Sequence, residues 1–303
     1  MNYGVVVVGL GGIGLTYDLK TINTKSRQSH SFAFNDHPGF TLLAGVDPNE
    51  NARSMFENTF ELPAFTNMAL LPTETIEAAD AFVISSSSNS HLNVIKELSL
   101  LKNNPWVLCE KPMGISLQEA LSISSYLDTN KILINYSRRF SKDLPALESA
   151  FKAFLGKDKS MILSCKAYGG TLRTGSHFLD LLNKWFNLDF SSIQPEFFKI
   201  RDNDDFLLNF QDIIVNYRDI DVNSKESYGF MELNYKDKKI HYIRDVLTII
   251  DGQEVSKTEI NIDQSDTCNA FYELISSQGV INKCSYSDGL NVHKVIDLMK
   301  KNR

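Results

Sequence analysis

Five residues near the start of the chain have the spacing of a loop that binds phosphate groups. The β-branched run Tyr3–Val8 leads directly into this loop, whose key positions are Gly9, Gly11, Gly12, Ile13 and Gly14. In such a loop the glycines permit a tight turn, a close approach of the backbone to a pyrophosphate and close packing of the following helix. The first turn of that helix offers free N–H groups to the phosphates. The sequence therefore predicts a dinucleotide-binding loop, with a purely structural glycine turn as the alternative.

An acidic residue after the second apolar run agrees with this interpretation. Asp47 follows Phe40–Val46, where a carboxylate accepts hydrogen bonds from ribose hydroxyls and repels the additional phosphate of NADP. We therefore expect NAD as the cofactor, in preference to NADP. Asp47 lies 33 positions after Gly14, whereas about 20 is usual. The excess is the polar stretch Leu15–Ser29, for which a lid that excludes water and an ordinary surface loop are both open.

Lys111 is the first candidate for proton transfer. It comes directly after the strand predicted at Trp106–Cys109, and doubly wound sheets bind their ligands at the carboxyl ends of strands. Burial beside a nicotinamide cation would lower the pKa of its ammonium group toward a range useful for proton transfer. The alternative is a lysine that only hydrogen-bonds substrate or ribose. Glu110 is either a partner of this lysine or a surface residue.

His177 is the second candidate, because imidazole gains and loses a proton near neutral pH. Asp180 follows it by three positions and would share its face of a helix. A single histidine is more often structural, so the residue type alone does not decide the role. The remaining histidines have no metal-ligand spacing, and the chain contains no GxSxG or P-loop motif. Metal-dependent and serine-dependent catalysis are therefore disfavoured.

Short apolar runs separated by amphipathic stretches predict how the first third folds. Strands are expected at Tyr3–Val8, Phe40–Val46, Ala81–Ser85 and Trp106–Cys109, with helices at Asn49–Asn58 and Ser90–Lys102. Strands that are apolar on both faces and alternate with helices indicate a parallel sheet covered on both sides. The first part of the chain is therefore expected to be an α/β Rossmann domain, a doubly wound parallel sheet.

The pattern changes after Pro112. Helices are expected at Leu117–Leu127, Leu144–Leu155, Asp266–Ser277 and Ser287–Lys301, and Ser116 and Glu119 have the spacing of a capping box. Strands are expected at Met161–Tyr168, Phe197–Arg201, Ile213–Tyr217, Tyr228–Tyr235, Ile240–Arg244 and Leu247–Asp251. Short polar turns between them predict a mostly antiparallel open sheet in a C-terminal α+β domain. We expect the domains to comprise residues 1–116 and 117–303.

Composition narrows the classes of protein. The 303 residues are 43% apolar, which suffices for a large core, and 37 acidic residues against 31 basic ones give a net charge of −6. This balance disfavours binding to nucleic acid or a membrane surface. No apolar stretch is long enough for a membrane span, and the N-terminus does not resemble a signal peptide. Four scattered cysteines without a CxxC motif predict reduced thiols and a cytoplasmic location.

Four further segments resemble the Gfo/Idh/MocA family of oxidoreductases. They are Ser85–His91, similar to a Thr-Pro-x-x-x-His segment but with Ser87 in place of proline; Cys109–Pro112, with Glu-Lys-Pro; Asn135–Phe140, with Arg-Arg-Phe; and Gly169–Asp180, with the Gly-Gly and His-x-x-Asp parts of a longer signature. The resemblance implies hydride transfer between NAD and a hydroxyl-bearing carbon of a sugar or polyol. It also implies a final helix, about 287–301, packed on the first domain, and a homodimer or homotetramer joined through the sheet.

The resemblance also assigns roles to individual residues. It implies catalysis by Lys111 and His177, and a cis peptide bond before Pro112. Substrate contacts are implied for Arg138, Asn135 and Asp180, and contacts along the dinucleotide for Ser86, Ser87, Asn89, His91, Glu110 and Lys111. Arg173 departs from the family, which often has an aspartate four residues before the histidine. A guanidinium at this point suggests an anionic substrate, such as a sugar acid or nucleotide sugar.

Three functions agree with these features. The leading one is an NAD-dependent dehydrogenase of a sugar, a polyol or an acidic or nucleotide-linked sugar. The second is a glycosidase that uses NAD for transient oxidation, and the third is a non-catalytic protein that binds a dinucleotide or sugar. Arg173 is the feature that favours the third.

Overall fold

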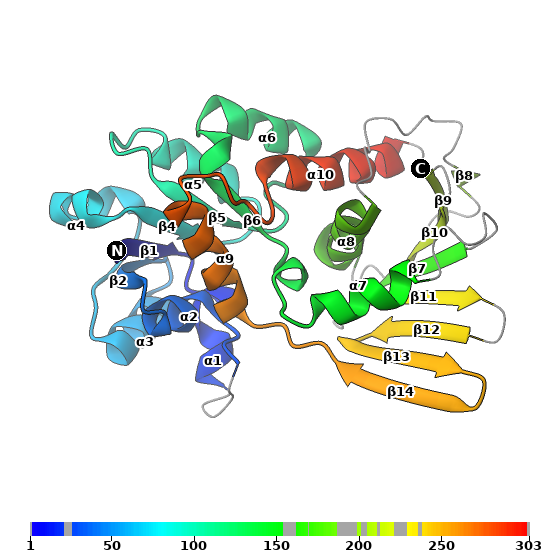
Figure 1. Cartoon of the computed structure of the whole chain (residues 1–303). Coiled ribbons are helices and arrows are strands. Elements are labelled where there is room, and N and C mark those ends of the chain that lie inside the picture. Colours follow the sequence, from blue (N-terminus) through cyan, green and yellow to red (C-terminus); the bar gives the residue numbers. More distant parts are fainter. Residues whose placement is uncertain are drawn as a thin grey trace. The chain divides into compact units, whose positions relative to one another are not determined.

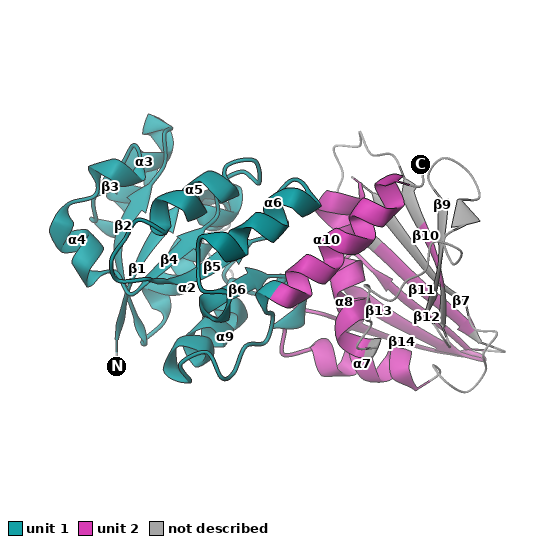
Figure 2. Cartoon of the chain, turned by 90° about the horizontal axis from the view of Figure 1, so that it is seen from above, with its two compact units in different colours: residues 1–140, 262–286 teal, residues 141–261, 287–303 magenta. Residues whose placement is uncertain are grey.

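A computed structural model gives the fold of the chain (Figure 1). It describes residues 2–20, 26–153, 162–168, 170–186, 199–200, 205–210, 213–220, 229–235 and 238–301. The chain forms two compact units. Unit 1 comprises Met1–Phe140 and Ile262–Tyr286, and unit 2 comprises Ser141–Asn261 and Ser287–Arg303 (Figure 2).

Unit 1 contains a six-stranded parallel sheet in the order β3-β2-β1-β4-β5-β6. Its strands are β1 (Tyr3–Val8), β2 (Phe40–Val46), β3 (Ala64–Phe65), β4 (Ala81–Ile84), β5 (Trp106–Glu110) and β6 (Ile132–Asn135). Strand β1 is nearly all buried, and every residue of β4, β5 and β6 is buried, as expected for strands covered on both faces. This is the strand order of a Rossmann fold, so the expected doubly wound sheet is confirmed.

The helices of unit 1 surround this sheet. They are α1 (Tyr17–Leu19), α2 (His30–Asp36), α3 (Glu50–Phe60), α4 (Thr73–Ala78), α5 (His91–Leu98), α6 (Leu117–Ser122) and α9 (Gln264–Ser276). Ser116 caps α6 as expected, because its Oγ accepts the Glu119 N–H at 3.2 Å. The Glu119 side chain completes the cap by accepting the N–H of Ile115 at 2.9 Å.

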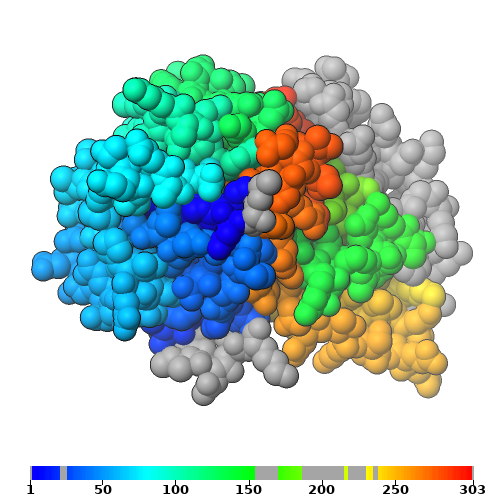
Figure 3. Space-filling model, turned by 60° about the vertical axis from the view of Figure 1, so that its left-hand side comes forward, coloured from blue at the N-terminus to red at the C-terminus, as the bar shows by residue number. Residues whose placement is uncertain are grey.

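Helix α9 returns to unit 1 from far along the chain. Its Phe271 ring lies 6.1 Å from the rings of both Phe34 in α2 and Phe40 in β2, and Tyr272 lies 5.8 Å from Tyr3. The face of the molecule in Figure 3 shows the orange residues of α9 beside the blue N-terminal residues. Burial of these aromatic rings explains why a segment so distant in sequence belongs to this unit.

Unit 2 contains an eight-stranded mixed sheet in the order β14-β13-β12-β11-β7-β10-β9-β8. The strands are β7 (Ile162–Tyr168), β8 (Lys199–Ile200), β9 (Asp205–Phe210), β10 (Ile213–Ile220), β11 (Gly229–Tyr235), β12 (Lys238–Ile243), β13 (Val246–Asp251) and β14 (Glu254–Glu259). All neighbours pair antiparallel except β7 and β10. The expected mostly antiparallel sheet is confirmed. Helices α7 (Leu144–Lys152), α8 (Ser176–Phe186) and α10 (Tyr286–Lys301) complete the unit.

The division into units differs from the expected boundary at residue 116. Helix α6 and strand β6 belong to unit 1, because β6 extends the parallel sheet beside β5. Nearly all of α10 clusters with unit 2, where Asn183 Nδ2 lies 3.3 Å from Asp288 Oδ1. The distant segment that clusters with unit 1 is residues 262–286, which contains α9.

Within the part of the chain that the structure describes, no helix is both long enough and apolar enough to cross a lipid bilayer.

Candidate functional site

The glycines of the first loop have separate structural reasons. Gly9 has a φ of 100°, and a Cβ there would lie 2.3 Å from the Ser86 backbone nitrogen. A Cβ at Gly14 would lie 1.9 Å from the Gly9 carbonyl oxygen. A Cβ at Gly11 would have no described atom within 4 Å, so the backbone is open there. The pyrophosphate of a dinucleotide could approach the backbone closely at this point, where a side chain would obstruct it.

The helix after this loop begins with an unusually wide turn. Residues 12–16 form a π-helical turn, in which the Thr16 N–H donates to the Gly11 carbonyl at 3.0 Å. The ring of half-exposed Tyr17 lies across Gly12, since a Cβ at Gly12 would be 2.6 Å from Tyr17 Cζ. Turns of this kind are frequent at functional sites. Tyr17 thus covers one flank of the phosphate loop, a position that no local pattern in the sequence revealed.

Asp47 lies beside the same loop, at the carboxyl end of β2. Its Oδ2 accepts the Leu10 N–H at 2.7 Å, and its Oδ1 accepts the Asn49 N–H at 2.8 Å. These two donors hold the half-exposed carboxylate against the phosphate loop, where a ribose can reach its remaining lone pairs. Arg53 donates from Nη1 to the carbonyl oxygens of Asp47 and Pro48, each at 2.9 Å.

The serine-rich segment after β4 closes another side of the loop. Ser85 donates its hydroxyl to the Gly9 carbonyl at 2.7 Å, and exposed Ser87 donates to Asn89 Oδ1 at 2.6 Å. Ser86 is half-buried, and its Oγ accepts the Ser90 hydroxyl at 2.7 Å. Ser85 and the backbone of Ser86 thus lie against Gly9 of the loop, and contacts of Ser86, Ser87 and Asn89 with a dinucleotide stay a prediction.

His91 is buried, in contrast to these serines. Its Nε2 lies 2.9 Å from the Ser86 carbonyl oxygen and its Nδ1 lies 3.0 Å from the Pro112 carbonyl oxygen. Burial lowers the pKa of His91, against the hydrogen bonds to Ser86 and Pro112 and the nearby carboxylates, which raise it. The structure therefore places His91 between the serine-rich segment and the Lys111 turn, as a residue that joins them.

Lys111 lies at the carboxyl end of β5 and is half-buried. Its peptide bond to Pro112 is cis, as the family resemblance implied. The neighbouring Glu110 is buried, and its Oε2 accepts the Lys111 backbone N–H at 3.2 Å. The backbone of the candidate proton-transfer residue is thus bound directly by a carboxylate.

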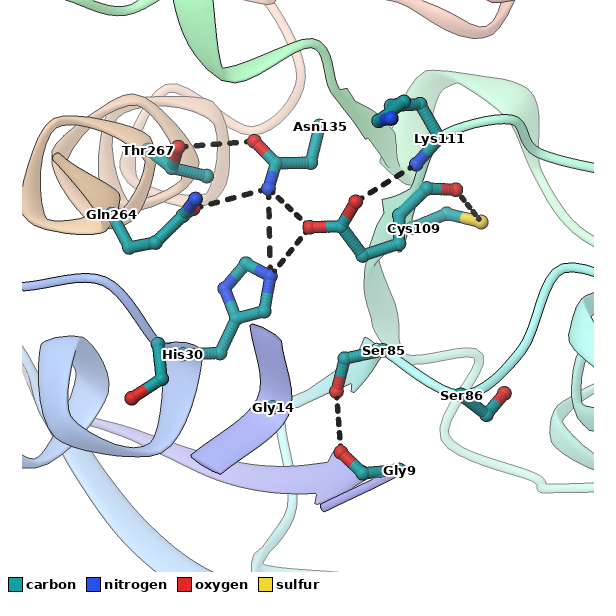
Figure 4. A network of polar contacts seen from close by, with 12 residues as sticks. Gly9, Gly14, His30, Ser85, Ser86, Cys109, Lys111, Asn135, Gln264 and Thr267 are labelled. Carbon is teal, nitrogen blue, oxygen red and sulfur yellow. Dashed lines mark hydrogen bonds and ion pairs between the residues drawn. The ribbon is translucent and has the colours of Figure 1, made fainter. Parts of the chain in front are cut away.

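Four side chains hold that carboxylate or each other in a network (Figure 4). His30 Nε2 lies 2.8 Å from Glu110 Oε1, and Asn135 Nδ2 lies 2.5 Å from the same oxygen. Asn135 also donates to Gln264 Oε1 at 3.1 Å and accepts the Thr267 hydroxyl at 3.0 Å. The residues come from α2, β5, β6 and α9, so elements distant in sequence fix Glu110.

The pKa of Glu110 lies below its ordinary value. Burial opposes ionisation, but the hydrogen bond and charge of His30, the charge of Lys111 and the hydrogen bond from Asn135 outweigh it. A buried carboxylate is kept charged when partners supply hydrogen bonds and opposite charge. Glu110 is therefore an ionised acceptor at neutral pH.

The other sequence-predicted residues of unit 1 take different positions. Asn135 is buried and uses its amide within the network, so it positions Glu110 instead of presenting a free amide to substrate. Arg139 is buried and donates to the Lys283 carbonyl at 3.2 Å, whereas Arg138 is half-buried. Of the two arginines, Arg138 thus remains the candidate for a substrate contact.

The candidate residues of unit 2 cluster at the start of α8. His177 and Asp180 lie in its first turns and are buried, with Asp180 fully inaccessible. Arg173 lies in the π-helical turn Thr171–Gly175 just before this helix and is exposed. The turn begins after Gly170, which has a φ of 89°. The exposed side chain of Arg173 agrees with contact to an anion. The burial of Asp180 favours a supporting role for that residue.

The polar stretch after the phosphate loop contains contacts that the sequence did not reveal. Asp18 is buried, and its carboxylate accepts the backbone N–H groups of Gln28 at 3.0 Å and Ser29 at 2.8 Å. The Arg27 carbonyl accepts the Gln264 N–H at 2.8 Å. Residues 21–25 lie outside the described residues, so the expected lid is not assessed there. The described residues on either side of 21–25 are thus held by hydrogen bonds within unit 1.

Comparison with known proteins shows which family the first part of the chain resembles. Residues 3–136 match the sequence profile of an oxidoreductase family with an NAD-binding Rossmann fold. The match includes the phosphate loop, Asp47, the serine-rich segment and the Glu-Lys-Pro turn. Residues 3–136 are thus similar to the Gfo/Idh/MocA family of oxidoreductases. The expected resemblance and an NAD-type cofactor are thereby confirmed.

One curated relative is the glucose-6-phosphate 3-dehydrogenase of Bacillus subtilis. It is 29% identical over 114 residues, which are 38% of this chain and 27% of the relative. The match thus spans about a quarter of that relative's length. The likeness includes part of the chain only, so the activity of the whole protein is a matter for proposal.

Solved structures resemble the whole chain. One is a variant of the 3-ketoreductase KijD10 from Actinomadura kijaniata, in complex with TDP-benzene and NADP, with a TM-score of 0.73 and 13% identity over 100% of this chain and 98% of that one. Another is the UDP-N-acetylglucosamine 3-dehydrogenase GnnA from Acidithiobacillus ferrooxidans, with a TM-score of 0.68 and 14% identity over 99% and 96%. At such low identity these similarities show the fold.

No cluster of three or more metal-ligating side chains occurs in the described ranges.

His30 is the clearest functional candidate that the sequence analysis did not single out. It lies 80 positions from Glu110 in the chain, so no local spacing indicated their contact.

Proposed function

We propose that the protein is a dehydrogenase that transfers a hydride between NAD and a hydroxyl-bearing carbon of an anionic sugar. The observation that carries this proposal is the open backbone at Gly11 beside the anchored carboxylate of Asp47. Together they fit the pyrophosphate and the adenosine ribose of a dinucleotide. The family match of residues 3–136 supports the reaction class.

The cofactor preference follows from charge. Asp47 presents a carboxylate where the ribose hydroxyls of the cofactor would bind, and the additional phosphate of NADP would be repelled there. Arg53 lies close by, but its guanidinium donates to backbone carbonyls of Asp47 and Pro48. We therefore expect NAD to bind more tightly than NADP.

Lys111 and His177 carry the proton chemistry in this proposal. The phosphate loop and Asp47 would hold NAD, which would supply the hydride acceptor for the carbon that carries the hydroxyl group. Lys111 and His177 are each candidates to take the hydroxyl proton as the carbonyl forms or to donate a hydrogen bond to its oxygen. Asp180 supports this region, and Arg138 contacts the substrate. Which of the two residues takes the proton is a question for their separate substitution.

The substrate class follows from Arg173. An exposed guanidinium four residues before His177 supplies planar donors for a phosphate or carboxylate. Two relatives are named for substrates that carry phosphate, glucose 6-phosphate and UDP-N-acetylglucosamine. We therefore propose a phosphorylated, nucleotide-linked or acidic sugar as substrate.

The test starts with the cofactor. Titration of the purified protein with NADH and NADPH, followed by fluorescence, should give saturation by both or by NADH alone, with NADH at least tenfold tighter. The Asp47→Asn variant should reduce the difference in affinity between NADH and NADPH, because it removes the charge that repels the additional phosphate of NADPH. Saturation by neither dinucleotide contradicts the proposal.

The second step is turnover of a panel of phosphorylated, nucleotide-linked, acidic and neutral sugars, measured as NADH formation. Arg173→Ala should raise KM for the charged sugars about tenfold and leave neutral sugars unchanged. If Arg173→Ala leaves the ratio of KM for charged sugars to KM for neutral sugars unchanged, the proposal of an anionic substrate is contradicted. Sugar hydrolysis without accumulation of NADH would indicate a glycosidase that uses NAD transiently. Dinucleotide binding without any turnover would indicate a binding protein.

A further inference from the structure

A buried histidine after the polar stretch 15–29 reaches the carboxylate next to Lys111. His30 is the first residue of α2, and its fully buried side chain places Nε2 2.8 Å from Glu110 Oε1. We propose that His30 is a positioning residue, which acts through Glu110 to hold Lys111 at the carboxyl end of β5. The proposal rests on the function proposed above for Lys111, and it gives a role to a residue outside the family motifs described here.

The two oxygens of Glu110 have different tasks. His30 and Asn135 both donate to Oε1, whereas Oε2 accepts the Lys111 backbone N–H at 3.2 Å. Because the acceptor is an ionised carboxylate, the proton of the His30 ring lies on Nε2. Among the described residues, none is a hydrogen-bond partner for His30 Nδ1, so the contact to Glu110 is the hydrogen bond that orients the ring. A carboxylate bound at both oxygens cannot rotate freely, so the direction of the Lys111 backbone depends on His30.

The position of His30 is itself fixed from the phosphate loop. Asp18 follows the first helical turn after that loop, and it accepts the Ser29 N–H at 2.8 Å and the Ser29 hydroxyl at 2.5 Å. Ser31 donates its hydroxyl to the Gly14 carbonyl at 2.7 Å. His30 thus lies between two residues that are bound to the loop region. Contacts thus run from the phosphate loop to the start of α2 through Ser31, and from His30 through Glu110 to the Lys111 backbone, the second part of which Figure 4 shows.

Charge explains what Lys111 would lose without His30. Besides His30, the titratable groups that interact with Glu110 are Lys111, His91 and Cys109. Burial raises the pKa of the Cys109 thiol and lowers that of His91, so neither group is favoured as a cation beside Glu110. The charge of Lys111 lowers the pKa of Glu110, so the Glu110 carboxylate in turn stabilises the Lys111 ammonium. Without a donor from His30 this buried carboxylate takes up a proton more readily, and the Lys111 ammonium loses its counter-charge.

The test compares variants that keep or remove the donor. His30→Phe and His30→Leu lack an N–H, and Phe preserves the ring that lies 6.4 Å from Phe34. His30→Gln keeps an N–H that can reach Glu110. His37→Gln is the matched control, because His37 directly follows α2 and interacts with Asn269. NADH titration of each full-length variant reports whether unit 1 is folded.

The main readout is the reactivity of the Lys111 amine, which requires no substrate. The proteins are treated with formaldehyde and cyanoborohydride between pH 6 and pH 10, and methylation of the Lys111 peptide is followed by mass spectrometry. We expect methylation at pH 8 to be at least threefold faster in His30→Phe or His30→Leu. We expect His30→Gln and His37→Gln to resemble the unmodified protein. If one non-donor variant fails to bind NADH, the other provides the test.

Turnover separates the two proposals. With an accepted sugar, the non-donor variants should lose about tenfold in kcat with KM and NADH affinity within twofold, and His30→Gln should restore kcat. Faster methylation of Lys111 in a protein that converts no sugar supports the positioning role and contradicts the proposed function. Unchanged methylation in a non-donor variant that still binds NADH overturns the positioning role, whatever its turnover.

Discussion

At the scale of residues, the glycines of the phosphate loop separate folding from binding. Gly9 and Gly14 are required by close packing, since any Cβ there would collide with backbone atoms of Ser86 or Gly9. Gly11 has no such neighbour among the described residues, and its φ of −75° suits any residue. Glycine at position 11 thus agrees with a molecule that approaches the backbone there.

Substitution of Gly11 by alanine should therefore affect binding without affecting folding. We expect Gly11→Ala to keep its urea-unfolding midpoint and to lose at least tenfold in NADH affinity, about 1.4 kcal/mol. Gly14→Ala is the comparison, and it should lower the midpoint clearly because its Cβ would lie 1.9 Å from the Gly9 carbonyl oxygen. Full NADH affinity in Gly11→Ala would mean that the cofactor does not approach this backbone.

At the scale of elements, the stretch after the phosphate loop is fixed by a single buried carboxylate. Asp18 binds Gln28 and Ser29, and these residues lead into α2. Beyond Asp18, the Arg27 N–H donates to Asp263 Oδ1 at 3.0 Å and Gln28 Nε2 donates to the Ile262 carbonyl at 3.2 Å. The start of α2 and the start of α9 are thus bound to each other.

Removal of this carboxylate should destabilise unit 1. Asp18→Ala leaves buried donors of Gln28 and Ser29 without an acceptor, at a cost of about 3 kcal/mol in the free energy of unfolding. Asp36→Ala serves as the control, because Asp36 forms only a partly exposed ion pair with Arg27, worth less than about 1 kcal/mol. Both can be measured by urea unfolding of the full chain. Equal losses in the two variants would contradict an anchoring role for Asp18.

At the scale of the whole molecule, the sheet of unit 2 has two unlike faces. Leu247, Tyr242 and Met231 lie on one face and are buried. The alternate positions form the other face, and they are half-exposed or exposed although several are apolar: Phe230, Ile243, Val246, Ile250 and Val255. The same face also carries charged side chains, among them Glu232, Lys239 and Lys257, so it is mixed. Apolar side chains exposed on such a face are suited to association between copies of a chain.

We therefore predict a homodimer or homotetramer that buries this second face. Light scattering of the purified protein should give a mass of two or four chains. Ile250→Lys should shift the mass toward the monomer, because it adds a charge beside the apolar side chains of this face, whereas Lys96→Ala, at an exposed position of α5 in unit 1, should leave the mass unchanged. A monomeric mass for the unmodified protein would rule out this association.

Local patterns in the sequence determined the Rossmann sheet, the phosphate loop and the acidic residue after β2. These features depend on neighbours in the chain: a β-branched run, glycines at fixed offsets and an apolar strand that ends in Asp47. Strand β3 was not expected, because a run of two residues carries no periodicity. The capping residues of α6 were likewise predictable, since a cap depends on residues three positions apart.

Only the tertiary structure decided which side chains surround Lys111. Its neighbour Glu110 binds His30 and Asn135, which lie 80 and 25 positions away, and Asn135 binds Gln264 across 129 positions. Contacts over such separations leave no periodic trace in one sequence. The assignment of Asn135 to a buried network, the return of α9 to unit 1 and the role proposed for His30 all depend on them. Residue types near the loop thus predicted the cofactor, whereas packing of distant elements determined how its neighbouring lysine is held.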